Sequence, residues 1–279
     1  MTNQEDYSLL YLWDKRTLYL GNLLGRVTLT PVTASLLVGL EGTFEFRSSS
    51  RGRVTTAVAL IPAGETLSMD HGNQLVACSH LDPISNDFAL LRNLMSNRSG
   101  NLYYDSPMLS QMQQCCTDIY RSRKDAETAY RQFLDEVFPE PPMVTGTTRH
   151  FHAIKKAVAI IRSRPADNLS NTDLAASVGL SSSQLQRQFK AATGVPVRRY
   201  RLWYRLFVTA AFMGQGMSLT EASLEAGFSD ASHFNHTFKS MLGVKPSYIL
   251  KRRDQIRILL GNRCGTKVTG HLAAVGSPA

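Results

Sequence analysis

Two short clusters of polar side chains carry most of the hydrogen-bonding potential in the second half of the chain. Their members are spaced by three or four residues, so on a helix each cluster lies on one face. The candidate contact residues are Ser183, Gln186, Arg187 and Lys190 in the first cluster and Ser232, His233, Asn235, His236 and Lys239 in the second. Side chains of these types hydrogen-bond to base edges and phosphate oxygens. Taken singly, each could equally be a solvated surface residue.

An internal repeat supplies the elements that would position these clusters. Its copies span residues 174–195 and 222–244. Gly179 matches Gly227 at a separation of 48 residues, whereas the later Phe-Lys and Gly-Val pairs match at 49. One residue is therefore inserted after the glycine of the second copy. The shared order of these residues indicates duplication of one supersecondary unit.

Each copy has the pattern of a helix-turn-helix unit. A short Ala-rich helix (172–178 and 219–226) reaches a glycine that can adopt positive φ, and Ser181 or Ser229 follows as a candidate cap for the next helix. The residues expected to face inward are Leu185 and Phe189 in the first copy and Phe234, Phe238 and Met241 in the second. The polar clusters are then left on the outer faces.

A third helix is expected between the two copies, over residues 198–213. Its length of roughly 24 Å would set the two second helices about one duplex turn, roughly 34 Å, apart. The arginines in this segment are candidates for pairing with phosphates, although some could only solvate the helix.

The charge of the chain is divided between its halves. Residues 1–148 carry a formal charge of −4, whereas residues 149–279 carry +13, and the overall composition (43% hydrophobic, 19% charged) is that of an ordered globular protein. A basic half beside an acidic one suggests that one domain meets a polyanion. A solvated basic surface without a partner explains the charge alone, but not the duplication.

The repeat region resembles the DNA-binding domain of the AraC/XylS transcription regulators over residues 154–250. The matching positions are Leu174-Ala175, Gly179-Leu180-Ser181, Leu185, Arg187, Phe189-Lys190, Gly194, Ala226-Gly227-Phe228-Ser229-Asp230, Phe234, Phe238-Lys239, Gly243, Pro246 and Tyr248. The resemblance implies that both second helices enter successive major grooves. It places base contacts at Ser183, Gln186, Arg187, Ser232, His233, Asn235 and His236. It also implies promoter DNA and RNA polymerase as partners of an activator.

Two departures from the family pattern bear on the second unit. Many relatives carry an arginine directly after the tyrosine at position 248, whereas this chain has Ile249-Leu250 before its next basic residues. Relatives also often have arginine in place of His236. Readout by the second helix is therefore expected to be weaker or sensitive to pH.

The first half of the chain is predicted to be rich in strands. Seven candidates lie at residues 8–13, 17–24, 27–30, 35–40, 43–47, 54–61 and 75–80, followed by helices at 86–97 and, as a pair, within 109–137. The predicted fold is α+β with two domains. Many short strands at close spacing indicate a sandwich or a small β-barrel. The resemblance to the AraC/XylS regulators implies that this domain, with its flanking helices, is a cupin-like sensor and dimerisation domain over 1–140, followed by a linker over 141–149. An all-α DNA-binding domain with two helix-turn-helix units spans 150–263 and is helical to about residue 257.

The N-terminal half lacks the residues of a catalytic cupin. Such a site needs two or three histidines and a carboxylate on one metal, but this half contains only His71 and His80, with His150 at its end. We expect His71 to be a surface residue, and we expect no metal, no cofactor and no catalytic residues. The barrel could enclose a small organic effector of unknown identity.

Two apolar stripes run along the helices expected within 109–137. They consist of Leu109, Met112, Cys116 and Ile119, then Tyr130, Phe133, Leu134 and Val137. They would form a homodimer interface, or they would cover the barrel of their own chain.

Neither targeting signals nor paired cysteines are apparent. Cys78, Cys115, Cys116 and Cys264 have no zinc-ligand spacing and are expected to be reduced thiols, and no apolar run is long enough to span a membrane, so a cytoplasmic protein is predicted. An enzyme with a reactive cysteine fused to a DNA-binding module is an alternative, as is a structural nucleoid protein. The first needs an exposed, electropositive thiol, and the second needs no base-reading face.

Overall fold

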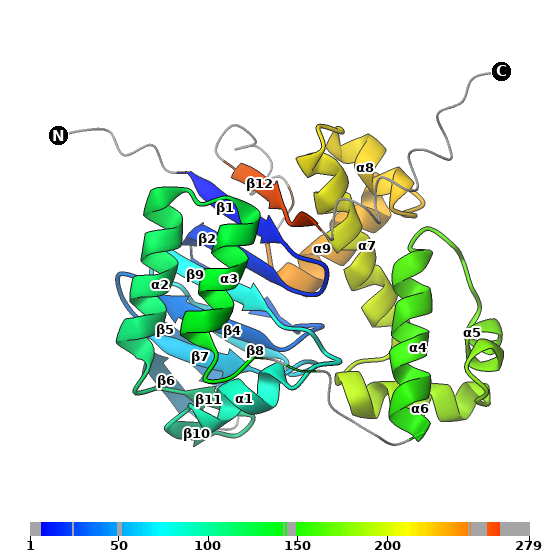
Figure 1. Ribbon diagram of the computed structural model, residues 1–279, viewed down its shortest axis with the longest axis horizontal. Helices are drawn as coiled ribbons and strands as arrows, with labels where there is room; N and C mark the ends of the chain where they lie inside the picture. The colour runs from blue at the N-terminus through cyan, green and yellow to red at the C-terminus, as the bar shows by residue number, and fades with distance from the viewer. Residues whose placement is uncertain are drawn as a thin grey trace.

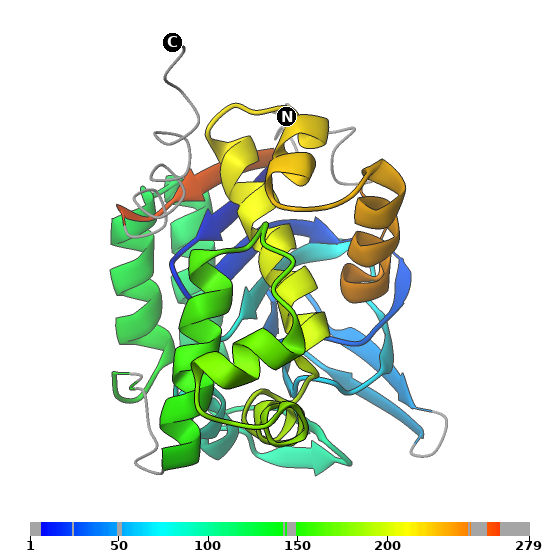
Figure 2. The same cartoon turned by 90° about the vertical axis from the view of Figure 1, so that its right-hand side faces the viewer.

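The computed structural model describes residues 7–23, 25–48, 52–141, 143, 149–244, 246 and 256–262. A sheet-rich N-terminal domain packs against a C-terminal helical domain (Figure 1). The helical domain lies in front of the two sheets when the molecule is turned as in Figure 2. The predicted α+β architecture with two domains is therefore confirmed.

Two sheets form the N-terminal domain. The strands are β1 (Ser8–Leu12), β2 (Thr17–Leu23), β3 (Arg26–Leu29), β4 (Ser35–Gly39), β5 (Phe44–Ser48), β6 (Gly52–Thr56), β7 (Val58–Ile61), β8 (Leu67–Asp70), β9 (Gln74–His80), β10 (Asn97–Ser99), β11 (Leu102–Tyr104) and β12 (Ile256–Leu260). The large sheet has the order β10-β11-β7-β4-β9-β2-β1-β12, and the small sheet has the order β3-β8-β5-β6. Within the described residues the two ladders remain separate, so the domain is a sandwich of two sheets.

Alternation along the central strands sorts side chains between two cores. In β4, Leu36 and Val38 point to one core and Leu37 to the other, as the two-residue period of a strand requires. The core around Leu37 lies between the sheets and includes Phe44 and Phe46. Because both faces are covered, every residue of β4 is buried.

The strand expected at 54–61 is two strands. It breaks at Ala57, so that β6 joins the small sheet and β7 the large one. The residues on both sides of Ala57 are typical of strands, so the sequence does not indicate that the chain passes from one sheet to the other at this point. Strands β8, β10 and β11 were not expected, and the helix expected at 86–97 is shorter, because α1 spans Asp87–Asn93.

Helices α2 (Leu109–Ser122) and α3 (Ala126–Val137) cover the outer face of the large sheet. Arg123, in the left-handed conformation, ends α2, and the Asp125 side chain caps α3 by accepting from two backbone N–H groups. Met112, Ile119 and Phe133 are fully buried in the core that they share with the sheet. The apolar stripes therefore cover the sheet of their own chain, which was the alternative to a homodimer interface.

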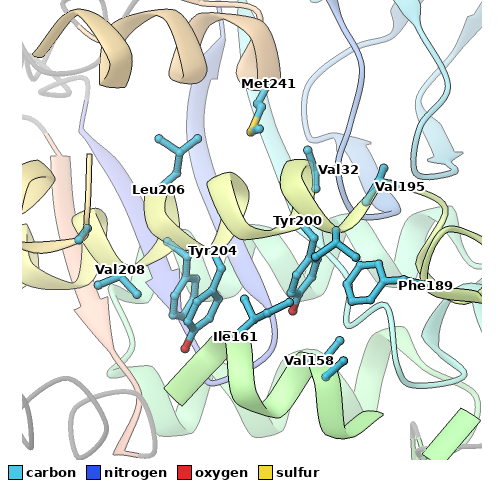
Figure 3. Packing of buried hydrophobic residues seen from close by; sticks show 14 of the residues in the cluster. Val32, Val158, Ile161, Phe189, Val195, Tyr200, Tyr204, Leu206, Val208 and Met241 are labelled. Carbon is cyan, nitrogen blue, oxygen red and sulfur yellow. The ribbon is translucent and has the colours of Figure 1, made fainter. Parts of the chain in front are cut away.

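The C-terminal domain contains α4 (Arg149–Ser163), α5 (Asn171–Ser177), α6 (Ser182–Thr193), α7 (Val197–Gly214), α8 (Leu219–Glu225) and α9 (Ala231–Leu242). Their apolar faces meet around α7, as Figure 3 shows for Phe189, Tyr200 and Tyr204. Val32 of the N-terminal domain packs in the same cluster. Arg162 of α4 also reaches across the boundary, where its Nη2 lies 3.3 Å from Asp82 Oδ1.

The expectation of helix up to about residue 257 was wrong at its end. Residues Ile256–Leu260 form β12, which pairs in parallel with β1 at the edge of the large sheet. Ile258 packs against the helical core, whereas Leu259 belongs to the core under α2 and α3. This alternation is that of a strand, but a segment of five residues is too short for periodicity to separate strand from helix. Among the residues that the structure describes, no helix has the length and apolar character to cross a membrane.

Candidate nucleic-acid interface

The first helix-turn-helix unit is built as the sequence predicts. The Ser170 side chain caps α5, and Gly179 turns the chain with a φ of 70°. Ser181 and Gln184 then form a reciprocal capping box at the start of α6, and Gly194 ends that helix at a φ of 82°. These caps fix both ends of α6.

Helix α6 separates its faces cleanly. Leu185 and Phe189 are fully buried, and the Phe189 ring lies edge-on to Tyr200 of α7 with their centroids 5.5 Å apart. The four predicted contact residues, Ser183, Gln186, Arg187 and Lys190, are all exposed. The structure thus brings them together on one solvent-facing surface.

The second unit differs from the prediction at its cap. Ser218 and Glu221 form a capping box on α8, and Gly227 makes the turn with a φ of 94°. The cap of α9 is then Asp230, whose side chain accepts from His233 N at 2.8 Å, while Ser229 donates to Asp230. The residue inserted in the second copy moves the cap one position beyond Ser229.

Helix α9 presents a similar outer face. Ser232, Asn235, His236 and Lys239 are exposed. His233 is half-buried, because its ring stands edge-on to Phe228 at 5.2 Å and its Nδ1 lies 3.2 Å from Ser229 Oγ. Phe234 and Met241 are buried as expected, but Phe238 is half-buried and lines a cavity between the domains.

The arginines of α7 have a role that the sequence did not reveal. Arg205 is 7% exposed and donates to the carbonyl oxygens of Pro165 and Ala166. Arg201 donates to Asp167 O at 2.7 Å, and Arg199 donates to Thr30 O at 2.6 Å. These side chains fix the loop before α5 and join the two domains. The expected phosphate pairing therefore does not describe Arg201 and Arg205, while Arg198 is exposed.

A cavity of about 250 Å³ lies between the large sheet and helices α7 and α9. His71, expected at the surface, is 4% exposed and forms part of its wall, with Nδ1 3.4 Å from Gly25 O. The turn that carries it folds inward against Phe44, whose ring is edge-on at 6.1 Å. Burial lowers the pKa of His71. The described residues contain no group of three or more metal-ligating side chains.

A second histidine, His80, stands in the same wall. Its Nδ1 lies 2.9 Å from Ser35 Oγ, and its ring is edge-on to Trp203 of α7 at 4.5 Å. Burial lowers the pKa of His80 to about 4, so the ring is neutral at physiological pH. This contact joins the last residue of β9 to the spacer helix.

The family model described as a helix-turn-helix domain matches residues 174–252. The chain is 33% identical over 103 residues to the uncharacterized HTH-type transcriptional regulator YidL of Escherichia coli, covering 37% of this chain and 35% of that protein. It is 29% identical over 136 residues to the transcriptional activator RhrA of Rhizobium meliloti, covering 46% and 43%. The chain thus spans less than half the length of these curated relatives.

The structure of ToxT from Vibrio cholerae is similar over most of both chains. It aligns with a TM-score of 0.55 at 13% identity and covers 85% of this chain and 97% of ToxT. ToxT has also been solved bound to (E)-4-(8-methylnaphthalen-1-yl)but-3-enoic acid. At this identity the likeness concerns the fold.

The chain thus combines two helix-turn-helix units, of a kind found in transcription regulators, with a sheet-rich domain whose arrangement is similar to that of ToxT. Residues 174–252 are therefore similar to the helix-turn-helix domains of transcription regulators, and the fold of the chain is similar to that of ToxT.

Proposed function

We propose that the chain binds promoter DNA sequence-specifically by placing α6 and α9 in successive major grooves. The observation that carries this proposal is that α6 and α9 each present an exposed polar face. Each of these helices begins at a capping side chain and ends at a glycine in the left-handed conformation. Each face offers amide, hydroxyl or imidazole groups that can hydrogen-bond to base edges, and each ends in one lysine. Helix α7 joins the two units without a break, so it acts as a rigid spacer.

Within this proposal the outer residues have two roles. Ser183, Gln186, Arg187, Ser232, His233, Asn235 and His236 read bases, whereas Lys190 and Lys239, one turn further along each helix, contact phosphates. The half-buried His233 has less freedom to reach a base than its exposed neighbours. We propose that residues 1–140 serve regulation, residues 141–149 form a linker and residues 150–263 bind DNA. Strand β12, near the end of the third segment, pairs with β1 of the first segment.

The regulatory part of the proposal has separate support. RhrA is a transcriptional activator, which favours activation through RNA polymerase for this chain as well. Because promoter DNA is read in the cytoplasm, this is the proposed location. ToxT binds an organic acid, which favours control of this chain by a small organic molecule. Most of the stripe residues on α2 and α3 are buried in their own chain, while Leu109, Tyr130 and Leu134 are half-buried, so a homodimer that used these helices would contact only their outer edges.

Catalysis by a reactive cysteine is the competing function, and the described thiols argue against it. Burial raises the pKa of Cys78 to about 12. It also contributes, with the neighbouring Cys116, to the raised pKa of Cys115. A nucleophilic cysteine needs the opposite shift. We therefore propose that the chain regulates transcription without catalysis.

Two substitutions on α6 test the proposed reading and anchoring roles. Arg187→Ala should weaken binding to the target site by about 1–3 kcal/mol and relax preference at one base position. Lys190→Ala should weaken binding to target and random DNA alike and reduce the salt slope by about one unit. The measurement is titration of both duplexes across a salt series, with a target defined by mapping bound genomic sites.

Arg121→Ala, which removes an exposed charge from α2, is the matched control and should leave both affinities nearly unchanged. Equal losses on target and random DNA for Arg187→Ala would show that this residue is a phosphate anchor.

A further inference from the structure

The cavity between the domains is lined by both halves of the molecule. The sheet contributes Leu10, Leu37 and His80, the spacer α7 contributes Trp203 and Leu206, and further side chains come from α9 and β12. Its volume of about 250 Å³ exceeds the ~150 Å³ of an engineered cavity that binds benzene. It therefore has room for an organic molecule with on the order of ten to fifteen non-hydrogen atoms.

The described part of the cavity wall is apolar or polar without a fixed charge. Among the described residues that line the cavity, none is a lysine, arginine, aspartate or glutamate. A buried carboxylate without a cation or several hydrogen-bond donors is strongly disfavoured. The two histidines do not supply that cation, since burial lowers the pKa of both.

One end of the cavity is polar. Ser35 Oγ lies 2.9 Å from His80 Nδ1, and Ser35 also donates to Thr33 O at 3.3 Å. Among the described residues Ser35 is the hydrogen-bond partner of this imidazole, so the other ring nitrogen, Nε2, is available to a ligand. Thr17 lines the same cavity. Because Ser35 donates to Thr33 O, His80 Nδ1 carries the proton of the neutral ring and Nε2 accepts, so this end of the cavity suits a hydroxyl group.

We propose that this cavity binds an uncharged, largely hydrocarbon molecule with a single hydroxyl group that donates to His80 Nε2. The hydrocarbon part packs against Leu206, Phe207 and Met213 of α7 and against the sheet. This inference rests on the proposed function only in treating the occupant as the effector. It differs from the acid bound by ToxT, because the described wall offers no partner for a carboxylate.

An occupant of this cavity would touch the back of the second recognition helix. Phe234, Phe238 and Met241 line the cavity, while Asn235 and Lys239 stand on the outer face of the same helix. The inner end of α9 also rests on the small sheet, where a Cβ on Gly243 would lie 3.0 Å from Val27 Cβ. A ligand therefore contacts both the sheet and the element that faces DNA.

The test compares 1-decanol with decanoate, which share a chain length and differ in charge. Full-length protein is titrated with each probe, and its thermal unfolding and tryptophan emission are recorded. Trp203 lines the cavity and Trp13 does not, and these are the two tryptophans of the chain. The expected result is a saturable rise of several degrees in Tm with 1-decanol, a change in emission, and at least tenfold weaker binding of decanoate.

Two substitutions in the cavity wall, with one control on the surface, assign the signal to the cavity. Ala210→Phe, which places a ring in the cavity, should abolish the response to 1-decanol, whereas Ala192→Phe on the exposed face of α6 should leave it intact. Met213→Lys, which adds a cation to the wall at a half-buried position, should shift the preference toward decanoate. A change of preference is not produced by a loss of stability.

Equal or tighter binding of decanoate by the unmodified chain would overturn the uncharged class of ligand. Absence of any saturable response to both probes would overturn the cavity as a ligand site. Both results would leave DNA binding by the ligand-free protein untouched, so they are distinguishable from failure of the proposed function.

Discussion

Arg198 and Arg205 lie on the same helix, seven residues apart, and the structure gives them opposite environments. Arg205 is buried and donates to loop carbonyls, whereas Arg198 is exposed. Arg205→Ala should lower the free energy of unfolding by roughly 2–4 kcal/mol, because it removes a buried side chain and leaves the carbonyl groups of the half-buried Pro165 and Ala166 without their donor. Arg198→Ala should change it by no more than about 0.5 kcal/mol. Urea unfolding followed by circular dichroism measures both, and equal losses would refute the structural role of Arg205.

His80 makes stability depend on pH. Its pKa falls from 6.5 to about 4 on folding because it is buried, so protonation favours the unfolded chain. The contribution is complete above pH 6.5 and is lost as pH falls toward 4, by up to about 3 kcal/mol. His80→Gln should flatten the dependence of unfolding free energy on pH in this window. His152→Gln, at an exposed position of α4, is the control. An unchanged slope in His80→Gln would contradict the assignment.

Residue orientations on the recognition helices could be predicted because they follow from helical periodicity alone. Leu185 and Phe189 are buried and Gln186 and Arg187 exposed, as expected. The role of Arg205 could not be predicted, because its partners are backbone carbonyls of a loop about forty residues away. His71 was misplaced for a similar reason, since the inward fold of its turn depends on contact with Phe44.

At the scale of elements, helices with caps were easier to predict than short strands. The boundaries of α6 follow from Ser181 and Gly194, which are local signals. In contrast, β8, β10, β11 and β12 have three to five residues each and are fixed by neighbours distant in sequence. The break at Ala57 likewise depends on which sheet each half joins. These pairings could not be predicted from local sequence, because each depends on a strand that is distant along the chain.

The C-terminal end of α6 rests on the turn between β7 and β8. A Cβ on Gly64 would lie 2.7 Å from Gly194 O, so this contact tolerates no side chain. Gly64→Ala should therefore separate the first recognition helix from the sheet domain, as well as incurring the cost of a positive φ, which is about 1 kcal/mol. We expect a loss of unfolding free energy about 1–3 kcal/mol greater than that cost.

Gly52→Ala is the matched control for this substitution. Gly52 has the same φ of 80° as Gly64, but a Cβ there would meet nothing within 4 Å. The free energy of unfolding of Gly52→Ala should therefore fall only by the cost of placing an alanine at positive φ. The same loss in both variants, measured by thermal and urea unfolding, would show that the contact between Gly64 and Gly194 does not hold the domains together.

At the scale of the whole molecule, the sheet domain contacts the inner sides of α6 and α9 and leaves their polar outer faces exposed. The ends of α6 and α9 rest on separate parts of that domain, near Gly64 and Val27, and α7 lies against the cavity between them. Strand β12 returns from the helical domain to pair with β1. This arrangement gives the N-terminal domain physical contact with both recognition helices.

The most direct test of the account measures which half of a DNA site each recognition helix reads. Full-length protein is titrated on a target duplex and on duplexes with either half-site scrambled. Replacing Gln186 and Arg187 by alanine should remove discrimination at one half-site, and replacing Asn235 and His236 should remove it at the other, each by about 1–3 kcal/mol per lost base contact. Loss of affinity by both variants to the same extent on target and random DNA would contradict sequence reading by two helices.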